Sequence, residues 1–228
     1  MVARSRQQDA VANNMANAET SGFKRQSVFM RQLQAAQASG GQSWLMPMQQ
    51  GTYIDFSQGP LDATNDPFNL AIDGEGFFVV ETPEGARYTR AGNFSRNAEG
   101  ELVTSDGFSL QSDGGPVVVT SEHFVVGERG EVSVDGTRVG NLQIVRFANP
   151  QQLKPIGRSL FHASQEAEID TNSSIRQGYL ERANFNLVHE MIQMMTTFRY
   201  YETAQKAVQI QDGTLDRAVN QIGRVQRG

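Results

Sequence analysis

Proline is confined to the middle of this chain, and that distribution constrains the fold more than any other feature of the sequence. All seven prolines lie between Pro47 and Pro155, and 17 of the 22 glycines lie between Gly40 and Gly157. Proline interrupts helices and glycine weakens them. The two ends can therefore form helices, whereas the middle favours short strands and turns. The sequence predicts an α+β fold with a central antiparallel β domain between terminal α-helices.

Strand and turn signals alternate through the middle of the chain. Residues 77–81 and 87–89 are rich in β-branched and aromatic side chains and flank the turn signal at 83–85. The intervals between such runs are too short for crossover helices, so antiparallel pairing is expected. The other predicted strands are residues 93–96, 101–104, 117–120, 131–134 and 141–147.

A heptad pattern fills the C-terminal segment. Steps of four and three residues from Leu187 reach eleven positions, of which nine are apolar or aromatic. This pattern predicts a helix of roughly 35–40 residues, about 55 Å long, that packs lengthwise on other helices. Such a helix extends beyond a small β domain and leaves an apolar seam that needs partners in this chain or in others; folding back onto its own β domain is the alternative. The seam residues are Leu187, Met191, Met194, Phe198, Tyr201, Val208 and Leu215.

The N-terminal segment supplies a second, shorter helix. Val11, Met15 and Ala18 have heptad-like spacing, and the helix is expected to end near Gly22, a residue suited to a left-handed helix terminus. Residues 26–60 are interpreted as a partly extended connector, helical around 27–38. The two terminal helices are predicted to pair in a coiled-coil-like manner.

Composition excludes several function classes. The formal net charge of −5 argues against a nucleic-acid partner, and the absence of cysteine excludes thiol chemistry and disulfides. The longest apolar run has four residues, so no membrane insertion is expected, and the first 25 residues carry no Sec-type signal.

No catalytic, cofactor or metal site is predicted. His189 and Glu190 begin a zinc-protease pattern, but Gln193 stands where the second histidine is needed. Asp73 and Glu75 could serve as paired carboxylates, which leaves a carbohydrate-acting enzyme with a helical dimerisation tail as an alternative of another class. A helical binding adaptor is a third alternative.

Seven short motifs resemble those of the bacterial flagellar rod and hook proteins, and they occur in the family's order. Two lie near the N-terminus, three in the β region and two near the C-terminus. They are ANNMAN at 12–17, TSGFKR at 20–25, LAIDGEGFF at 70–78, YTRAGNF at 88–94, LVTSDG at 102–107, GYLE at 178–181 and RYYE at 199–202. Asn184 and residues 186–188 and 190–191, between the last two, also match the family's C-terminal pattern.

The resemblance implies a structural, non-enzymatic subunit of the flagellar basal-body rod. Such a subunit assembles helically with itself and neighbouring rod proteins, transmits motor torque across the periplasm, and leaves the cell through the flagellar type III export apparatus without a Sec signal. The chain length and residues 144–151 point to the proximal rod, with the distal rod or another paralogue as the alternative.

The resemblance also assigns parts of the chain. Residues 1–25 and 186–228 form the helical assembly domain, 26–60 the connector, 61–165 the β domain and 166–185 a return segment. Gly22 and Phe23 are expected to turn the chain and anchor it to the β layer, and Thr20 lies in the same motif. The amides of Asn13, Asn14 and Asn17 are expected to form hydrogen bonds across subunits, with helix capping as the alternative.

The N-terminus departs from the family pattern. Only residues 1–11 precede the ANNMAN motif, where the family usually has a longer apolar helix. Two expectations stay open: either the given start lies downstream of the true one, or the packing of the N-terminal helix is weaker than usual.

Overall fold

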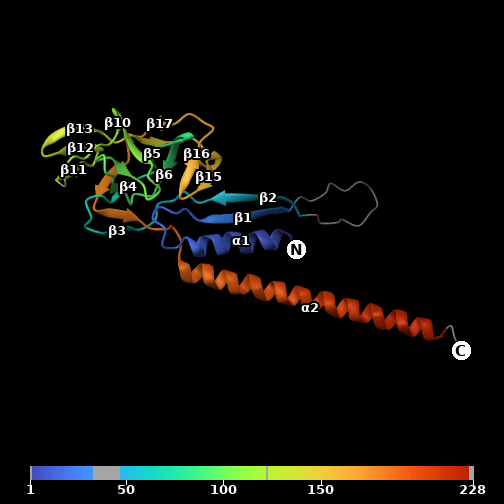
Figure 1. The fold of residues 1–228 in the computed structure, drawn as a ribbon. Helices are drawn as coiled ribbons and strands as arrows, with labels where there is room; N and C mark the ends of the chain where they lie inside the picture. The colour runs from blue at the N-terminus through green and yellow to red at the C-terminus, as the bar shows by residue number, and fades with distance from the viewer. Residues whose placement is uncertain (1, 33–46, 122, 226–228) are drawn as a thin grey trace. The chain divides into compact units, whose positions relative to one another are not determined.

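The computed structural model describes residues 2–32, 47–121 and 123–225 (Figure 1). The chain forms two compact units, each of which gathers segments that are distant in sequence. The helical unit contains Met1–Met15, Met30–Gln50 and Asn186–Gly228, and the β unit contains Ala16–Phe29 and Gly51–Phe185.

The β unit is built from short strands joined by tight turns. One 3₁₀ helix, η1 (Pro150–Gln152), interrupts them. The strands are β3 (Leu61–Ala63), β4 (Leu70–Asp73), β5 (Phe77–Thr82), β6 (Gly85–Thr89), β7 (Ser95–Arg96), β8 (Leu102–Val103), β9 (Ser109–Ser112), β10 (Gly115–Pro116), β11 (Phe124–Val126), β12 (Glu131–Val134), β13 (Thr137–Asn141), β14 (Ile144–Arg146), β15 (Lys154–Gly157), β16 (Leu160–His162), β17 (Glu168–Ile169), β18 (Ser174–Gln177) and β19 (Tyr179–Glu181).

These strands pair antiparallel, as the sequence predicts. The largest sheet has the order β15-β16-β6-β5-β9-β8-β7, with β10 paired to β9 and β14 paired to both β5 and β17. Strands β11, β12 and β13 form a separate three-stranded sheet. Late strands return to early ones, because β18 pairs with β4 and β19 pairs with β3.

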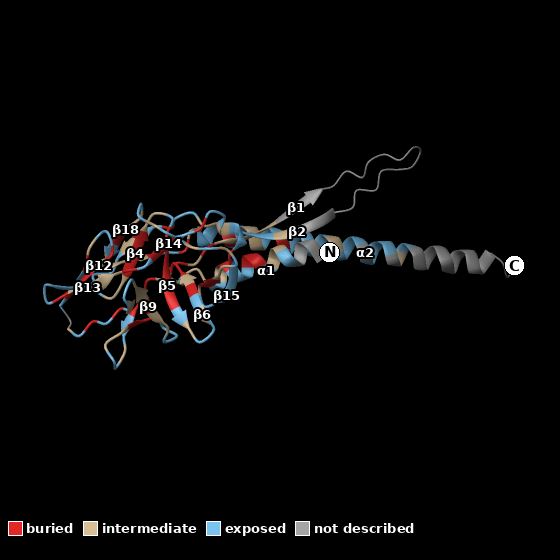
Figure 2. Ribbon diagram, turned by 90° about the horizontal axis from the view of Figure 1, so that it is seen from above, coloured by how far each residue is buried: buried red, intermediate tan, exposed pale blue. Residues whose placement is uncertain are grey.

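Strand β5 runs between two hydrophobic clusters and is buried on both faces. Phe78 and Val80 belong to the larger cluster, whereas Phe77 and Val79 belong to the smaller one. Successive side chains of a strand point to opposite faces, so one strand serves both clusters. Figure 2 shows the buried residues concentrated at β4 and β5. Apolar burial of this kind is the main stabilising contribution to the unit.

The helical unit contains the two terminal helices. Helix α1 spans Val2–Ala16 and helix α2 spans Leu187–Val225, a length of 39 residues that confirms the predicted long helix. Asn186 caps α2, because its Oδ1 accepts hydrogen bonds from the backbone N–H groups of Val188 at 2.9 Å and His189 at 3.3 Å. No helix within residues 2–32, 47–121 and 123–225 has the length and apolar character needed to cross a membrane.

The α+β prediction is confirmed, and three details of the sequence interpretation are wrong. Residues 27–32, expected to be helical, lie in strand β1 (Gln26–Gln32), which pairs with β2 (Pro47–Ile54); residues 33–38 lie outside the described residues. Helix α1 ends at Ala16, six residues before Gly22. Residues 117–120 form only a single bridge, between Val118 and Glu101.

The segment boundaries also differ from those expected. Residues 166–185, interpreted as a return segment, contribute β17, β18 and β19 to the β unit. Residues 16–25, assigned to the helical assembly domain, belong to the same unit, and so do residues 26–29 and 51–60 of the expected connector. Long-range strand pairing, which no local pattern encodes, is the physical reason for both differences.

Candidate assembly surface

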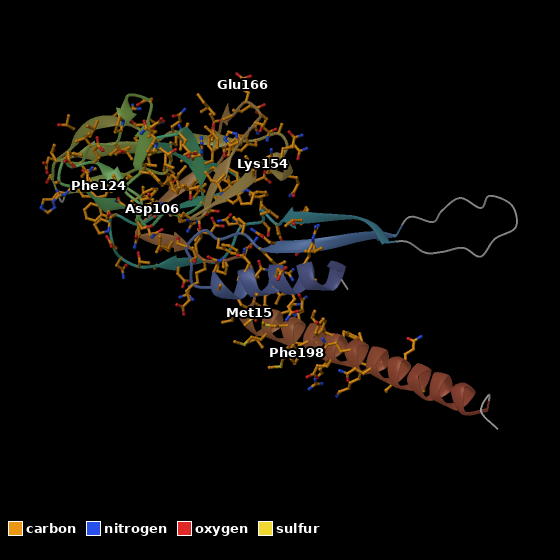
Figure 3. All side chains as sticks on the ribbon, turned by 45° about the vertical axis from the view of Figure 1, so that its right-hand side comes forward. Met15, Asp106, Phe124, Lys154, Glu166 and Phe198 are labelled. Carbon is orange, nitrogen blue, oxygen red and sulfur yellow. The ribbon has the colours of Figure 1, made fainter. Side chains whose placement is uncertain are left out.

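Helix α2 carries most of the large apolar side chains that remain exposed. Of the fifteen such side chains among the described residues, nine lie on this helix. Isolated exposed apolar residues are normal, but a continuous apolar face is typical of an interaction site. The nine residues are Leu187, Val188, Met191, Ile192, Met195, Phe198, Tyr200, Tyr201 and Ile210, and Figure 3 shows the side chain of Phe198 on α2.

Four of the predicted seam residues lie on this exposed face. The exposed fractions are 39% for Leu187, 41% for Met191, 50% for Phe198 and 41% for Tyr201. Met194 is half-buried, and the neighbouring stripe of Val188, Ile192 and Met195 is more exposed still. The predicted seam residues Val208 and Leu215 belong to α2, but their side chains lie outside those described.

The three asparagines of the N-terminal segment have different surroundings. Asn13 is exposed, whereas Asn14 is buried and donates from Nδ2 to Glu190 Oε2 at 3.2 Å. Asn17 follows the end of α1, where its carbonyl oxygen accepts from the Thr20 N–H at 3.0 Å and its Oδ1 accepts from the Thr20 hydroxyl at 3.3 Å. Asn17 and Thr20 thus form a local turn, and hydrogen bonding of these amides across subunits stays a prediction.

Gly22 and Phe23 connect the N-terminal segment to the β unit. The Gly22 N–H donates to the carbonyl oxygen of Glu181 at 2.7 Å. Its φ is +65°, and a Cβ added there would lie 2.3 Å from the carbonyl carbon of Arg90. The ring of Phe23 packs edge-on against Phe185 with centroids 6.2 Å apart. Gly22 is therefore required by a close backbone approach and not by a helix terminus.

Lys24, Arg90 and Glu181 form a buried group of charges, which we call the Glu181 cluster. Lys24 Nζ lies 2.6 Å from Glu181 Oε1, and Arg90 Nη1 lies 3.6 Å from Glu181 Oε2. Each of the three side chains is at most 1% exposed. Backbone groups complete the cluster, since Lys24 Nζ donates to Ser57 O at 2.8 Å and the Gly59 N–H donates to Glu181 Oε1 at 2.8 Å.

Burial and the charge of Glu181 shift the pKa values of Lys24 and Arg90 in opposite directions. Burial lowers the pKa of Lys24, while the charge of Glu181 raises it, and the net effect is a lowered pKa. Burial likewise lowers the pKa of Arg90 against the opposing charge of Glu181. The Arg90 guanidinium also lies over the Phe77 ring, 4.9 Å from its centroid, and donates to Gly74 O at 2.8 Å.

Asn184 links three segments of the same unit. Its Oδ1 accepts from the Arg25 N–H at 2.8 Å, and its Nδ2 donates to Asp55 O at 2.8 Å and Ser57 O at 3.0 Å. Lys24, Arg90 and Glu181 each lie inside one of the family motifs, and the sequence assigns none of them a role. The only local signal is a charge within a short motif that is otherwise largely uncharged.

Asp73 and Glu75, the carboxylates of the enzyme alternative, do not line a common groove. Asp73 forms an ion pair with Arg176 Nη2 at 2.7 Å across the β4–β18 pair. Glu75 lines a groove of about 800 Å³, and Asp73 is not among its lining residues. Asp55 and Glu168 line the same groove, and Glu168 pairs with Arg146 at 3.1 Å. Each of Asp73 and Glu168 thus has a cationic neighbour of its own.

Three protein-family models match successive parts of the chain. Residues 1–24 match "Flagella basal body rod protein", residues 71–134 match "Flagellar hook protein FlgE/F/G D1 domain", and residues 176–222 match "Flagellar basal body rod FlgEFG protein C-terminal". The flagellar basal-body rod protein FlgF of Caulobacter vibrioides is 34% identical to this chain, over 96% of this chain and 93% of that protein. This chain belongs to the flagellar basal-body rod protein family.

Other relatives carry related names. The rod protein FlgG of Bacillus subtilis is 31% identical over 93% of this chain and 92% of its own length. The hook-basal body complex protein FlhO of the same organism is 26% identical over 99% of this chain and 96% of its own length. As a member of this family, the chain is a structural subunit of the flagellar basal-body rod, and its partners are other rod components. The family is structural and not an enzyme family.

Proposed function

We propose that the two terminal helices form the part of this rod subunit that assembles, and that the exposed apolar face of α2 is the principal contact between neighbouring subunits. In this proposal α1 and α2 pair in a coiled-coil-like manner and stack with those of other subunits. The β unit then forms an outer layer. Contacts of this kind that do not close on themselves generate helical filaments, the form that an axial rod requires.

The exposure of the α2 face is the observation that carries this proposal. Leu187, Met191 and Phe198 remain between 39% and 50% exposed although they follow a heptad spacing. Full burial of a large apolar side chain contributes about 1.5–3 kcal/mol, so a row of them provides a strong association. Repeated along an axial assembly, such contacts also give the stiffness that transmission of motor torque demands.

We further propose the proximal rod as the position of this subunit. Support comes from residues 144–151, where strand β14 leads into η1. The distal rod is the rival position. Relatives with two different rod-protein names, FlgF and FlgG, match this chain at similar identities of 34% and 32%, so the identities do not separate the two positions. Locating the tagged subunit along purified rods distinguishes the two. Export through the flagellar type III apparatus belongs to the same proposal.

The double variant Met191→Asp/Phe198→Asp tests the assembly surface. Two carboxylates on the apolar face should block rod assembly, because burying a charge without a partner is costly. The measurement is the count of basal bodies with a complete rod, seen by electron microscopy of cells that produce the variant. Circular dichroism of the purified variant checks that its β unit still folds.

Thr196→Asp/Thr203→Asp is the matched control. Both threonines are exposed on α2, and their hydroxyls donate to Ile192 O and Arg199 O within the same helix. This variant adds the same charge outside the row of Leu187, Met191 and Phe198, although beside Ile192, and should impair assembly less. Complete rods from Met191→Asp/Phe198→Asp, at the frequency seen for the control, would contradict the proposed surface.

A further inference from the structure

A buried polar contact joins the two helices of the helical unit at a defined position. Asn14 lies in the last turn of α1 and Glu190 in the first turn of α2, and the Asn14 Nδ2 donates to Glu190 Oε2 at 3.2 Å. Both residues are only 1% exposed. The contact thus buries an amide and a carboxylate, whereas Ala10 and Val11, which are also buried on α1, are apolar.

Burial continues from this contact along both helices. On α1 it runs back from Asn14 through Val11 and Ala10, toward the N-terminus. On α2 it runs forward from Glu190 to the half-buried Met194 and the buried Thr197. Stripes that extend in these two directions from one shared contact fit the antiparallel helix pair of the proposed function.

Apolar contacts alone do not fix how far one such helix has slid along the other. Dispersion and hydrophobic contacts are non-directional, and a heptad pattern matches itself again after a shift of seven residues. A buried amide and carboxylate behave differently, because burying either one without a hydrogen-bond partner is strongly unfavourable. Only one alignment of α1 and α2 brings Asn14 and Glu190 together.

We propose that the Asn14–Glu190 hydrogen bond sets the register of α1 against α2 and thereby determines which apolar residues of α2 remain available to neighbouring subunits. This inference rests on the proposed function, in which the two helices pair. Asn14 and Glu190 are positioning residues: they select one alignment and do not form the assembly surface. Such a pair gives up stability for specificity, because two apolar residues in its place would bind at least as tightly.

Cysteine cross-linking in the purified full-length chain tests the register, and the chain contains no cysteine of its own. Val11 lies one turn before Asn14 on α1, and Met194 lies one turn after Glu190 on α2. In an antiparallel pair in the native register, these two residues face each other. The pair Val11→Cys/Met194→Cys therefore reports the native register. The pair Val11→Cys/Tyr201→Cys reports a slip of one heptad.

With Asn14 and Glu190 intact, oxidation should give the 11–194 disulfide within one chain and little of the 11–201 disulfide. In the background Asn14→Leu/Glu190→Leu, the ratio of the first product to the second should fall at least about tenfold, which corresponds to 1.4 kcal/mol. In the background Glu190→Gln, which keeps a hydrogen-bond acceptor for Asn14, the native ratio should be retained.

Two outcomes would overturn the register proposal. One is an unchanged ratio in the double-leucine background, which would show that packing alone sets the alignment. The other is a predominance of the 11–201 disulfide with Asn14 and Glu190 intact, which would show that the native register is not the one that this contact sets. Neither result affects the test of the α2 face, whose readout is rod assembly by Met191→Asp/Phe198→Asp, so the two proposals fail separately.

Discussion

Lys24 Nζ lies 2.6 Å from Glu181 Oε1, and both side chains are buried, although 157 positions separate the two residues in the chain. Lys24 follows the N-terminal turn, and Glu181 ends β19, the last strand of the β unit. Arg90, which follows β6, completes the cluster from a third segment. A single carboxylate thus connects the beginning, the middle and the end of the β unit.

Glu181→Gln should destabilise the β unit by about 3–5 kcal/mol, because it leaves Lys24 and Arg90 as two buried cations without their anion. Urea denaturation of the full-length chain, followed by far-ultraviolet circular dichroism, measures the change. Glu168→Gln is the control, since Glu168 and Arg146 are 57% and 49% exposed and such surface pairs contribute about 1 kcal/mol or less. Equal losses for the two variants would show that burial of the cluster has no energetic weight.

Gly22→Ala should destabilise the β unit at least about twice as much as Gly136→Ala. Both glycines have positive φ, +65° and +80°, so each substitution incurs the left-handed cost of roughly 1–2 kcal/mol. A Cβ at Gly22 meets the Arg90 backbone at 2.3 Å, whereas nothing lies within 4 Å of one at Gly136. Thermal unfolding of the two variants separates the steric cost from the conformational one, and similar melting temperatures would refute the close approach at Gly22.

A fragment of residues 16–185 should fold cooperatively, whereas a fragment of residues 61–165 should not. The shorter fragment lacks β18 and β19, which pair with β4 and β3, and it lacks both Lys24 and Glu181. Ile72 of β4, now 1% exposed, would lose the strand opposite it. Amide hydrogen exchange of the two fragments is the measurement. Protection of β4 in the shorter fragment would show that the late strands are dispensable.

The stability of the β unit should decrease with acidification partly through Asp170. Burial raises the pKa of this carboxyl, but hydrogen bonds from the Ser173 hydroxyl and from the N–H groups of Asn172 and Ser173 outweigh it. The net pKa lies below the ordinary value of 3.8. A folded-state pKa below the unfolded one means that the stabilisation is present above pH 3.8 and is lost as the pH falls through the lowered pKa.

Asp170→Asn is the variant that checks this contribution, because an amide does not titrate. Its melting temperature should fall less steeply with acidification below pH 3.8 than that of the unmodified chain. Ser173→Ala removes the hydroxyl donor and should reduce the same slope in part. Identical slopes for all three proteins would exclude Asp170 as a source of acid sensitivity.

The local patterns of the sequence predicted the elements that depend on local information. The heptad spacing from Leu187 predicted helix α2, and the apolar run at 77–81 predicted strand β5. The residues that hold distant segments together could not be predicted in this way. Lys24, Arg90 and Glu181 are each unremarkable in their own neighbourhood, and only the folded chain brings their charges together.

Two errors have a similar origin. Residues 27–32 contain no proline or glycine and were compatible with helix, but the Val28-Phe29 pair favours a strand once β2 is available as a partner. Val117 and Val119 are buried and form backbone hydrogen bonds to different segments, Leu110 and Leu102 for the first and Gly100 for the second. That arrangement satisfies the backbone without a continuous strand. Secondary structure was decided in both places by tertiary partners.

The pairing of β19 with β3 determines when the β unit can close. Glu181 is among the last residues of that unit to be synthesised. Lys24 and Arg90 therefore cannot form their ion pairs with it until most of the unit has left the ribosome. Contacts between such distant positions form slowly because a long loop must first be closed. If the chain is exported unfolded, as we propose for this subunit, the late arrival of Glu181 means that the β unit stays open while the chain is being synthesised.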